Sequence, residues 1–122
     1  MGKRVLLIED EPNIIEAISF ILSRDGWTVH THEDGSTAMD KIVAMPPDMI
    51  ILDVMLPGRS GFDILRDLRA HAQTKEIPVM MLTARGQDKD RELAERLGVN
   101  HFMTKPFSNT EVRDYVRSFM EA

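Results

Sequence analysis

Three continuous apolar runs divide the sequence, and a fourth segment alternates apolar and polar residues. The continuous runs are 5–8, 49–52 and 79–82, and the alternating segment is 27–31. A continuous run of this length is typical of a strand buried on both faces, whereas alternation is typical of a strand at a sheet edge. A weaker run at 101–103 follows Gly98 and precedes Pro106, which also favours an edge strand.

Between these runs the apolar spacing is that of amphipathic helices. Pro12 can open the first helix, where its missing N–H costs nothing, and the Pro46-Pro47 pair ends the second. We expect the third to begin near Ser60 and the fourth near Asp88. The stripes expected to face the sheet are Ile14, Ile18, Ile21 and Leu22; Met39, Ile42 and Val43; Phe62, Leu65 and Leu68; Leu93, Ala94 and Leu97; and Val112, Tyr115, Val116, Phe119 and Met120.

Strand and helix therefore alternate five times, which predicts an α/β fold with a parallel sheet. Right-handed crossovers place helices on both faces of such a sheet. With the alternating strand and the weak fifth strand at the edges, the five-stranded sheet takes the flavodoxin-like order 2-1-3-4-5. The length of 122 residues suits one domain over 1–122.

Composition narrows the range of functions. The chain has no cysteine, which excludes disulfide scaffolds, thiolate metal sites and cysteine nucleophiles. Its net charge is -5, from 15 basic and 20 acidic residues, and the basic ones are scattered, which argues against direct nucleic-acid binding. The apolar runs are too short for a signal peptide or a membrane span. We therefore expect a cytoplasmic protein with no membrane partner.

Ligands of a doubly wound sheet bind beyond the carboxyl ends of its strands, where the strand order reverses. The sequence delivers Glu9 and Asp10 after the first strand, Asp53 after the third, Thr83 after the fourth and Lys105 after the fifth. Crowded carboxylates repel one another and call for a cation, and an all-oxygen set suits Mg²⁺ better than zinc or copper. We expect Glu9, Asp10 and Asp53 to form a magnesium site.

The same residues suit phosphoryl transfer. A carboxylate can attack phosphorus to give an aspartyl phosphate, and Asp53 is the acid at the end of the central strand. Lys105 can pair with one phosphoryl oxygen, and Thr83 can hydrogen-bond another. Each residue alone has an ordinary structural explanation, such as a helix-terminal charge, a turn, a cap or a solvated lysine. Their joint arrival at one sheet edge favours the chemical interpretation.

Five segments then show a resemblance. They are Val5-Leu6-Leu7-Ile8-Glu9-Asp10-Glu11, Leu52-Asp53-Val54-Met55-Leu56-Pro57-Gly58, Ser60-Gly61-Phe62, Leu82-Thr83-Ala84-Arg85 and Lys105-Pro106-Phe107. In order and spacing the chain resembles a response-regulator receiver domain of two-component phosphorelay signalling over its whole length. The resemblance implies Mg²⁺-dependent phosphorylation of Asp53 by a sensor histidine kinase or histidine phosphotransfer protein. It further implies Asp10, Asp53, the Met55 carbonyl and, largely through water, Glu9 as metal ligands.

The resemblance also implies how the signal leaves the site. Thr83 and Phe102 would act as a switch, Met55 and Arg85 would tune the phosphoryl lifetime, and the bond before Pro106 would be cis. The output surface would comprise the fourth helix, the fifth strand and the fifth helix, acting on a downstream protein or on an effector domain outside this chain. Parts of the sequence resemble those of regulators that carry a winged-helix DNA-binding domain and dimerise through that surface.

One departure bears on that dimer. Asn100 and His101 stand where those relatives usually carry two aspartates that make ion pairs between subunits. Arg91, Arg113 and Arg117 remain as basic partners for a homodimer through this surface, which would have to form without those two carboxylates.

Three other functions are considered. An aspartyl-phosphate phosphatase would need a second Asp two residues beyond the nucleophile as general acid, and Met55 stands there. A flavin-binding module would need a phosphate-binding loop where Glu9-Asp10-Glu11 would repel phosphate. A receiver-like module that no longer takes phosphate would not need the intact acid, threonine and lysine set. We therefore expect a phosphoacceptor that dephosphorylates itself, and not a turnover enzyme.

Overall fold

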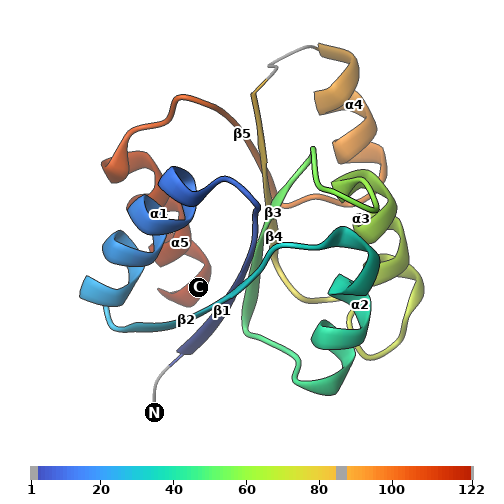
Figure 1. Ribbon diagram of the computed structural model, residues 1–122, viewed down its shortest axis with the longest axis horizontal. Coiled ribbons are helices and arrows are strands. Elements are labelled where there is room, and N and C mark those ends of the chain that lie inside the picture. The colour runs from blue at the N-terminus through green and yellow to red at the C-terminus, as the bar shows by residue number, and fades with distance from the viewer. Residues whose placement is uncertain (1–2, 85–87, 122) are drawn as a thin grey trace.

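The computed structural model describes residues 3–84 and 88–121 as alternating strands and helices (Figure 1). The strands are β1 (Lys3–Ile8), β2 (Trp27–His32), β3 (Met49–Asp53), β4 (Val79–Thr83) and β5 (His101–Thr104). The helices are α1 (Pro12–Arg24), α2 (Gly35–Ala44), α3 (Gly61–Ala70), α4 (Asp88–Arg96) and α5 (Asn109–Glu121). All four strand pairs are parallel, and the order is β2-β1-β3-β4-β5. The predicted flavodoxin-like order is confirmed.

The strand register aligns the carboxyl ends of the central strands. Ile8 pairs with Leu52, and Asp53 pairs with Leu82. Thr83 pairs with Thr104, so the fourth and fifth strands end together. The residues that follow β1, β3, β4 and β5 consequently meet at one edge of the sheet, where the sequence predicts the site.

Helices cover both faces of the sheet: α1 and α5 lie on one side, and α2, α3 and α4 lie on the other (Figure 1). The side chains of a strand alternate between faces, so each continuous apolar run contributes to two cores. Val5 and Leu7 face α1 and α5, whereas Leu6 and Ile8 face the other three helices. This division explains why β1, β3 and β4 are apolar at nearly every position. None of the helices in the described ranges is long and apolar enough to cross a bilayer.

The predicted helix stripes need two corrections. Val43 was expected to face the sheet, but it is exposed, and α2 buries Ala38 and Ile42 instead. In α3 the buried face includes Ile64, which the prediction omitted, while Phe62 is only half-buried. Both differences arise because a short helix buries a narrow stripe whose rotation is set by packing rather than by apolar spacing. The side chains of Phe119 and Met120 lie outside the described residues.

A polar network joins α3 to the start of β4 and β5. The half-buried Arg69 donates hydrogen bonds to the carbonyl oxygens of Lys75, Ile77 and Gly98. It also donates to Asn100 Oδ1, which accepts a second hydrogen bond from the backbone N–H of Val79. Asn100 therefore has structural partners on this chain.

Candidate functional site

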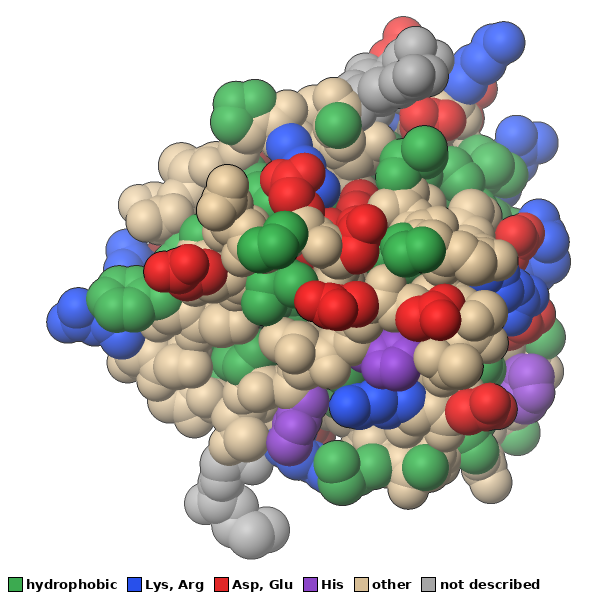
Figure 2. Space-filling model, viewed as in Figure 1, with side chains coloured by type: hydrophobic (Ala, Val, Ile, Leu, Met, Phe, Trp, Pro, Cys, Tyr) green, Lys and Arg blue, Asp and Glu red, His purple; other side chains and the backbone are tan. Residues whose placement is uncertain are grey.

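The structure brings all five predicted polar residues to the same edge of the sheet. Glu9 and Asp10 follow β1, Asp53 ends β3, Thr83 ends β4, and Lys105 follows β5. Glu9, Asp53 and Thr83 are buried, and Asp10 is exposed at the rim. Acidic side chains gather on the surface above the ends of the central strands (Figure 2).

Three carboxylates converge at this edge. One oxygen from each of Glu9, Asp10 and Asp53 lies within 4.8 Å of the others, a spacing that one metal ion could bridge. The donors are all oxygens, with no His or Cys, which matches the preference of Mg²⁺ for carboxylates and water. The side chain of Asp10 is exposed to solvent, whereas that of Glu9 is fully buried. The donor set therefore fits the predicted magnesium site.

Lys105 supplies the positive charge among these acids. Its Nζ donates a 2.8 Å hydrogen bond to Glu9 Oε1 and lies 3.6 Å from Asp53 Oδ2. Burial by itself lowers the pKa of Lys105, but the hydrogen bond to Glu9 and the charge of Asp53 outweigh it and raise the pKa overall. The ammonium is therefore fixed in its charged form. The bond between Lys105 and Pro106 is cis, as expected.

Asp53 is the most perturbed acid of the site. Its pKa is raised to about 7, first by burial and then by the neighbouring Glu9, which acts through a hydrogen bond and its charge. Lys105 and the backbone N–H of Met55 act in the opposite direction without cancelling it. A cation that takes the place of this proton would stabilise the ionised carboxylate.

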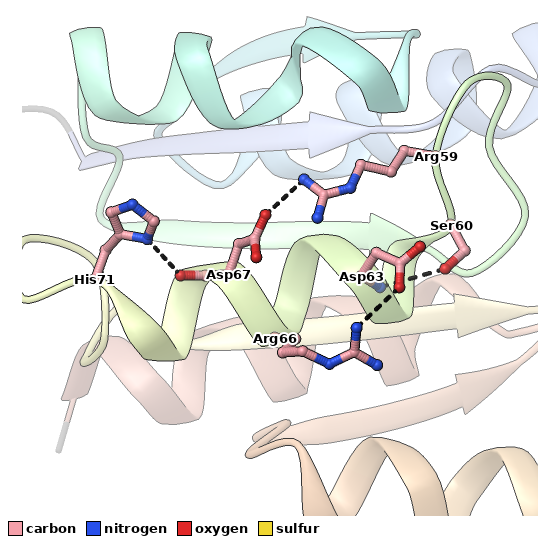
Figure 3. A network of polar contacts seen from close by, with 6 residues as sticks. All are labelled: Arg59, Ser60, Asp63, Arg66, Asp67 and His71. Atoms are coloured by element: carbon pink, nitrogen blue, oxygen red, sulfur yellow. Dashed lines mark hydrogen bonds and ion pairs between the residues drawn. The ribbon is translucent and has the colours of Figure 1, made fainter.

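The loop after β3 is held close to Asp53. A Cβ on Gly61 would lie 2.2 Å from the backbone oxygen of Asp53, so only glycine allows α3 to begin there. Ser60 Oγ caps α3 by accepting a hydrogen bond from the N–H of Asp63, and Arg59 forms a 2.6 Å ion pair with Asp67 (Figure 3). The sequence does not predict the ion pair of Arg59 with Asp67, because a basic and an acidic residue eight positions apart are common and need not be in contact.

Met55 lies at the entrance of the site. Its backbone N–H is 3.4 Å from Asp53 Oδ1, and its side chain is 70% exposed. Arg85, which was expected to act with Met55, lies outside the described residues.

The predicted switch residues lie on the neighbouring strands. Thr83 is buried at the end of β4, and Phe102 is buried in β5, 4% exposed. The guanidinium carbon of Arg91, in α4, lies 5.1 Å from the centre of the Phe102 ring. His101 points to the other face of β5, where its ring stacks on Tyr115 of α5 at 3.5 Å between centroids. The sequence analysis singles out Phe102 as a switch residue but does not predict that the guanidinium of Arg91 lies over its ring.

Comparison with known proteins identifies the family. The family model described as "Response regulator receiver domain" matches residues 5–117. The chain belongs to the response regulator receiver domain family. This receiver domain is 38% identical over 120 residues to the phosphate regulon transcriptional regulatory protein PhoB of Escherichia coli strain K12. The match covers 98% of this chain and 52% of PhoB, so the chain spans about half the length of that relative.

Two solved receiver structures extend the comparison. A putative response regulator from Chloroflexus aurantiacus J-10-fl superposes with a TM-score of 0.94 at 29% identity, covering 100% of both chains. The receiver domain of the sensor histidine kinase PA1611 from Pseudomonas aeruginosa PAO1 superposes with a TM-score of 0.90 at 29% identity, also covering 100% of both. That structure has a magnesium ion coordinated in its active-site cleft.

The raised pKa of Asp53 predicts how stability depends on pH in metal-free protein. The folded state holds a proton up to about pH 7, whereas the unfolded carboxyl loses it near 3.8, so stability falls as pH rises between these values. Asp53→Asn removes this cost. We expect its melting temperature at pH 8, in chelator, to exceed that of wild type by several degrees, with the difference vanishing near pH 4.

Asp40→Asn, which changes an exposed acid of α2, serves as the control and should leave the melting temperature unchanged at both pH values. Equal melting temperatures of wild type and Asp53→Asn at pH 8 would contradict the raised pKa.

Proposed function

We propose that this receiver domain, acting as one unit over residues 1–122, accepts a phosphoryl group on Asp53 from a sensor histidine kinase or a histidine phosphotransfer protein. The observation that carries the proposal is the position of Asp53: a buried carboxylate at the end of the central strand, beside two other acids and 3.6 Å from the Lys105 ammonium. The reaction transfers phosphorus from a histidine nitrogen to a carboxylate oxygen of Asp53. The imidazole leaves with the electron pair of the broken bond.

Glu9, Asp10 and Asp53, with the backbone carbonyl of Met55, are the groups that hold Mg²⁺ in this proposal. The bound ion offsets the negative charge of the acids and of the incoming phosphoryl oxygens. Support comes from the three carboxylate oxygens within 4.8 Å of one another and from the magnesium in the PA1611 receiver. When Mg²⁺ binds, the proton that the raised pKa of Asp53 retains near neutral pH would pass to solvent, which frees the attacking oxygen.

Lys105 and Thr83 bind the transferred group. Lys105 already points between Glu9 and Asp53, so a phosphoryl oxygen on Asp53 offers it a closer charged partner. The Thr83 hydroxyl donates to a second oxygen. The protein thus performs positioning and charge stabilisation, which is most of what phosphoryl transfer requires.

The phosphoryl group is then lost by hydrolysis, and the domain is a self-catalysed phosphoacceptor rather than a turnover enzyme. Met55 supports this distinction, because the residue two beyond Asp53 offers no carboxyl to protonate a leaving group. Its backbone N–H is 3.4 Å from Asp53 Oδ1 and its side chain is largely exposed, so we expect this side chain to limit how water reaches the phosphorus. The same role in setting the phosphoryl lifetime is assigned to Arg85 only because of its position in the family resemblance.

Phosphorylation switches the surface formed by α4, β5 and α5. Thr83 moves toward the phosphoryl group, and the space it leaves behind is filled by the ring of Phe102, which lies one strand away. Because Arg91 covers that ring, a movement of Phe102 changes the position of α4. The switched surface acts on a downstream protein or on an effector domain, consistent with the transcriptional role named for PhoB.

The output does not require direct nucleic-acid contact by this domain, whose net charge is -5. A homodimer through the same surface would lack the carboxylates of the related regulators. Asn100 is engaged with Arg69 and Val79, and His101 is stacked on Tyr115.

Incubation with acetyl phosphate and Mg²⁺, followed by intact-mass analysis, tests the acceptor. We expect one phosphoryl adduct on wild type, none after chelation of the metal, and none on Asp53→Asn. The Asp40→Asn control should be labelled like wild type. A persistent adduct on Asp53→Asn would move the acceptor to another residue.

The switch is tested by adding Mg²⁺ and the phosphoryl mimic beryllofluoride to ¹⁵N-labelled protein. We expect amide chemical shifts to change in β5 and in α4, and these changes to shrink in Phe102→Ala but not in Val43→Ala, which alters an exposed apolar residue elsewhere. A surface whose shifts stay constant while those next to Asp53 change would contradict the switch and leave the acceptor role intact.

A further inference from the structure

A polar cleft lies between α1 and α5, apart from the carboxylate site. Its volume is about 360 Å³, and its lining residues are Phe20, Ile21, Arg24, Asp25, Asn109, Arg113 and Arg117. The two helices contact each other on one face of the sheet (Figure 1). None of these seven residues takes part in the phosphoryl chemistry proposed above. A concavity of this size suits a small molecule.

The charge of the cleft is opposite to that of the protein. Three arginines and one aspartate line it, which gives +2 in a chain whose net charge is -5. Asn109, Arg113 and Arg117 are spaced by four residues and therefore share one face of α5. A concave surface lined by one sign of charge concentrates ions of the other sign.

The single acid in the cleft is committed to one arginine. Arg117 Nε donates a 2.9 Å hydrogen bond to Asp25 Oδ2, and a second nitrogen of Arg117 binds Asp25 Oδ1. This bidentate contact with Arg117 holds the pKa of Asp25 below its usual value, even though burial acts against it. Asp25 is therefore ionised and neutralises Arg117, which leaves Arg24 and Arg113 as the excess positive charge.

Arg113 has an unmet hydrogen bond. Its Nε is buried and has no acceptor among the residues that the structure describes. Its positive charge lowers the pKa of Asp25 from a distance, without a hydrogen bond between the two side chains. A buried donor of a charged group without an acceptor is costly, so such groups usually bind water, an ion or a ligand.

An aromatic ring borders the same cleft. Phe20 is 61% exposed, which is unusual for so large an apolar side chain, and the guanidinium carbon of Arg24 lies 5.4 Å from its ring centre. A guanidinium stacked on a ring keeps its N–H donors available in its own plane. The cleft thus combines two available cations with an exposed apolar surface.

We propose that the cleft between α1 and α5 binds a small organic dianion, a dicarboxylate or a phosphate monoester, through Arg113 and Arg24. The two guanidiniums each bind one carboxylate of a dicarboxylate, or together bind the oxygens of a single phosphate, because their planar donors match both groups. The apolar part of the ligand contacts Phe20. The small volume of the cleft, about 360 Å³, and its two excess positive charges favour a small dianion over an acidic segment of another protein.

Titration of ¹⁵N-labelled, metal-free protein with succinate and, separately, with inorganic phosphate tests the site, at constant ionic strength set with chloride. We expect saturable shifts of amides in 20–25 and 109–117. Arg113→Gln and Arg24→Gln should each weaken binding by about tenfold or more. Arg96→Gln, an exposed arginine at the end of α4, is the matched control and should bind like wild type.

Shifts that never saturate, or affinities unchanged by Arg113→Gln, would overturn the proposal. Saturable binding of an acidic peptide with no saturable binding of succinate or phosphate would also overturn it, because the anion would then come from a protein. If Arg113→Gln does not fold, Arg113→Lys keeps the charge but removes the Nε donor, and it should still weaken binding.

Discussion

Two buried carboxylates that share one ammonium set the conditions for the rest of this structure. Glu9 is fully buried and Asp53 is 4% exposed, and Lys105 contacts both. Asp10 adds a third acid at the rim, so three carboxyl groups meet one ammonium among the residues of the site that the structure describes. Such a cluster either keeps a proton or binds a cation. The raised pKa of Asp53 follows first from its burial and then from the neighbouring Glu9, and the fit to Mg²⁺ and the reactivity proposed for Asp53 follow from the same buried cluster.

The sheet makes this arrangement possible because it holds mutually repelling groups on rigid, fully buried strands. Ile8, Leu52 and Leu82, which precede or pair with the site residues, have no exposed surface. Gly61 allows α3 to start against the backbone of Asp53, and the ion pair between Arg59 and Asp67 ties the intervening loop to that helix. Moving the acids apart would therefore disrupt the core, so the repulsion is retained instead of relaxed.

The sequence alone predicts the strand order and the meeting of five polar residues at one edge of the sheet, because long apolar runs and strand-end polar residues are local signals. It does not predict which face a short helix buries. Val43 was expected to be buried in α2 but is exposed, and Ile64 is buried in α3 although it was not expected to be. It also misses contacts between distant residues, such as Lys105 with Glu9 or Arg91 over Phe102. The buried Nε of Arg113 is of the same kind, since only packing shows that its acceptor is missing.

The most direct test of the charge imbalance is the number of protons released when Mg²⁺ binds. It is measured by titration calorimetry in two buffers with different ionisation enthalpies. With a pKa of about 7, Asp53 should release about half a proton per bound ion at pH 7 and almost none at pH 9. Binding of Mg²⁺ at pH 7 without proton release would show that Asp53 is already ionised, and would contradict the account.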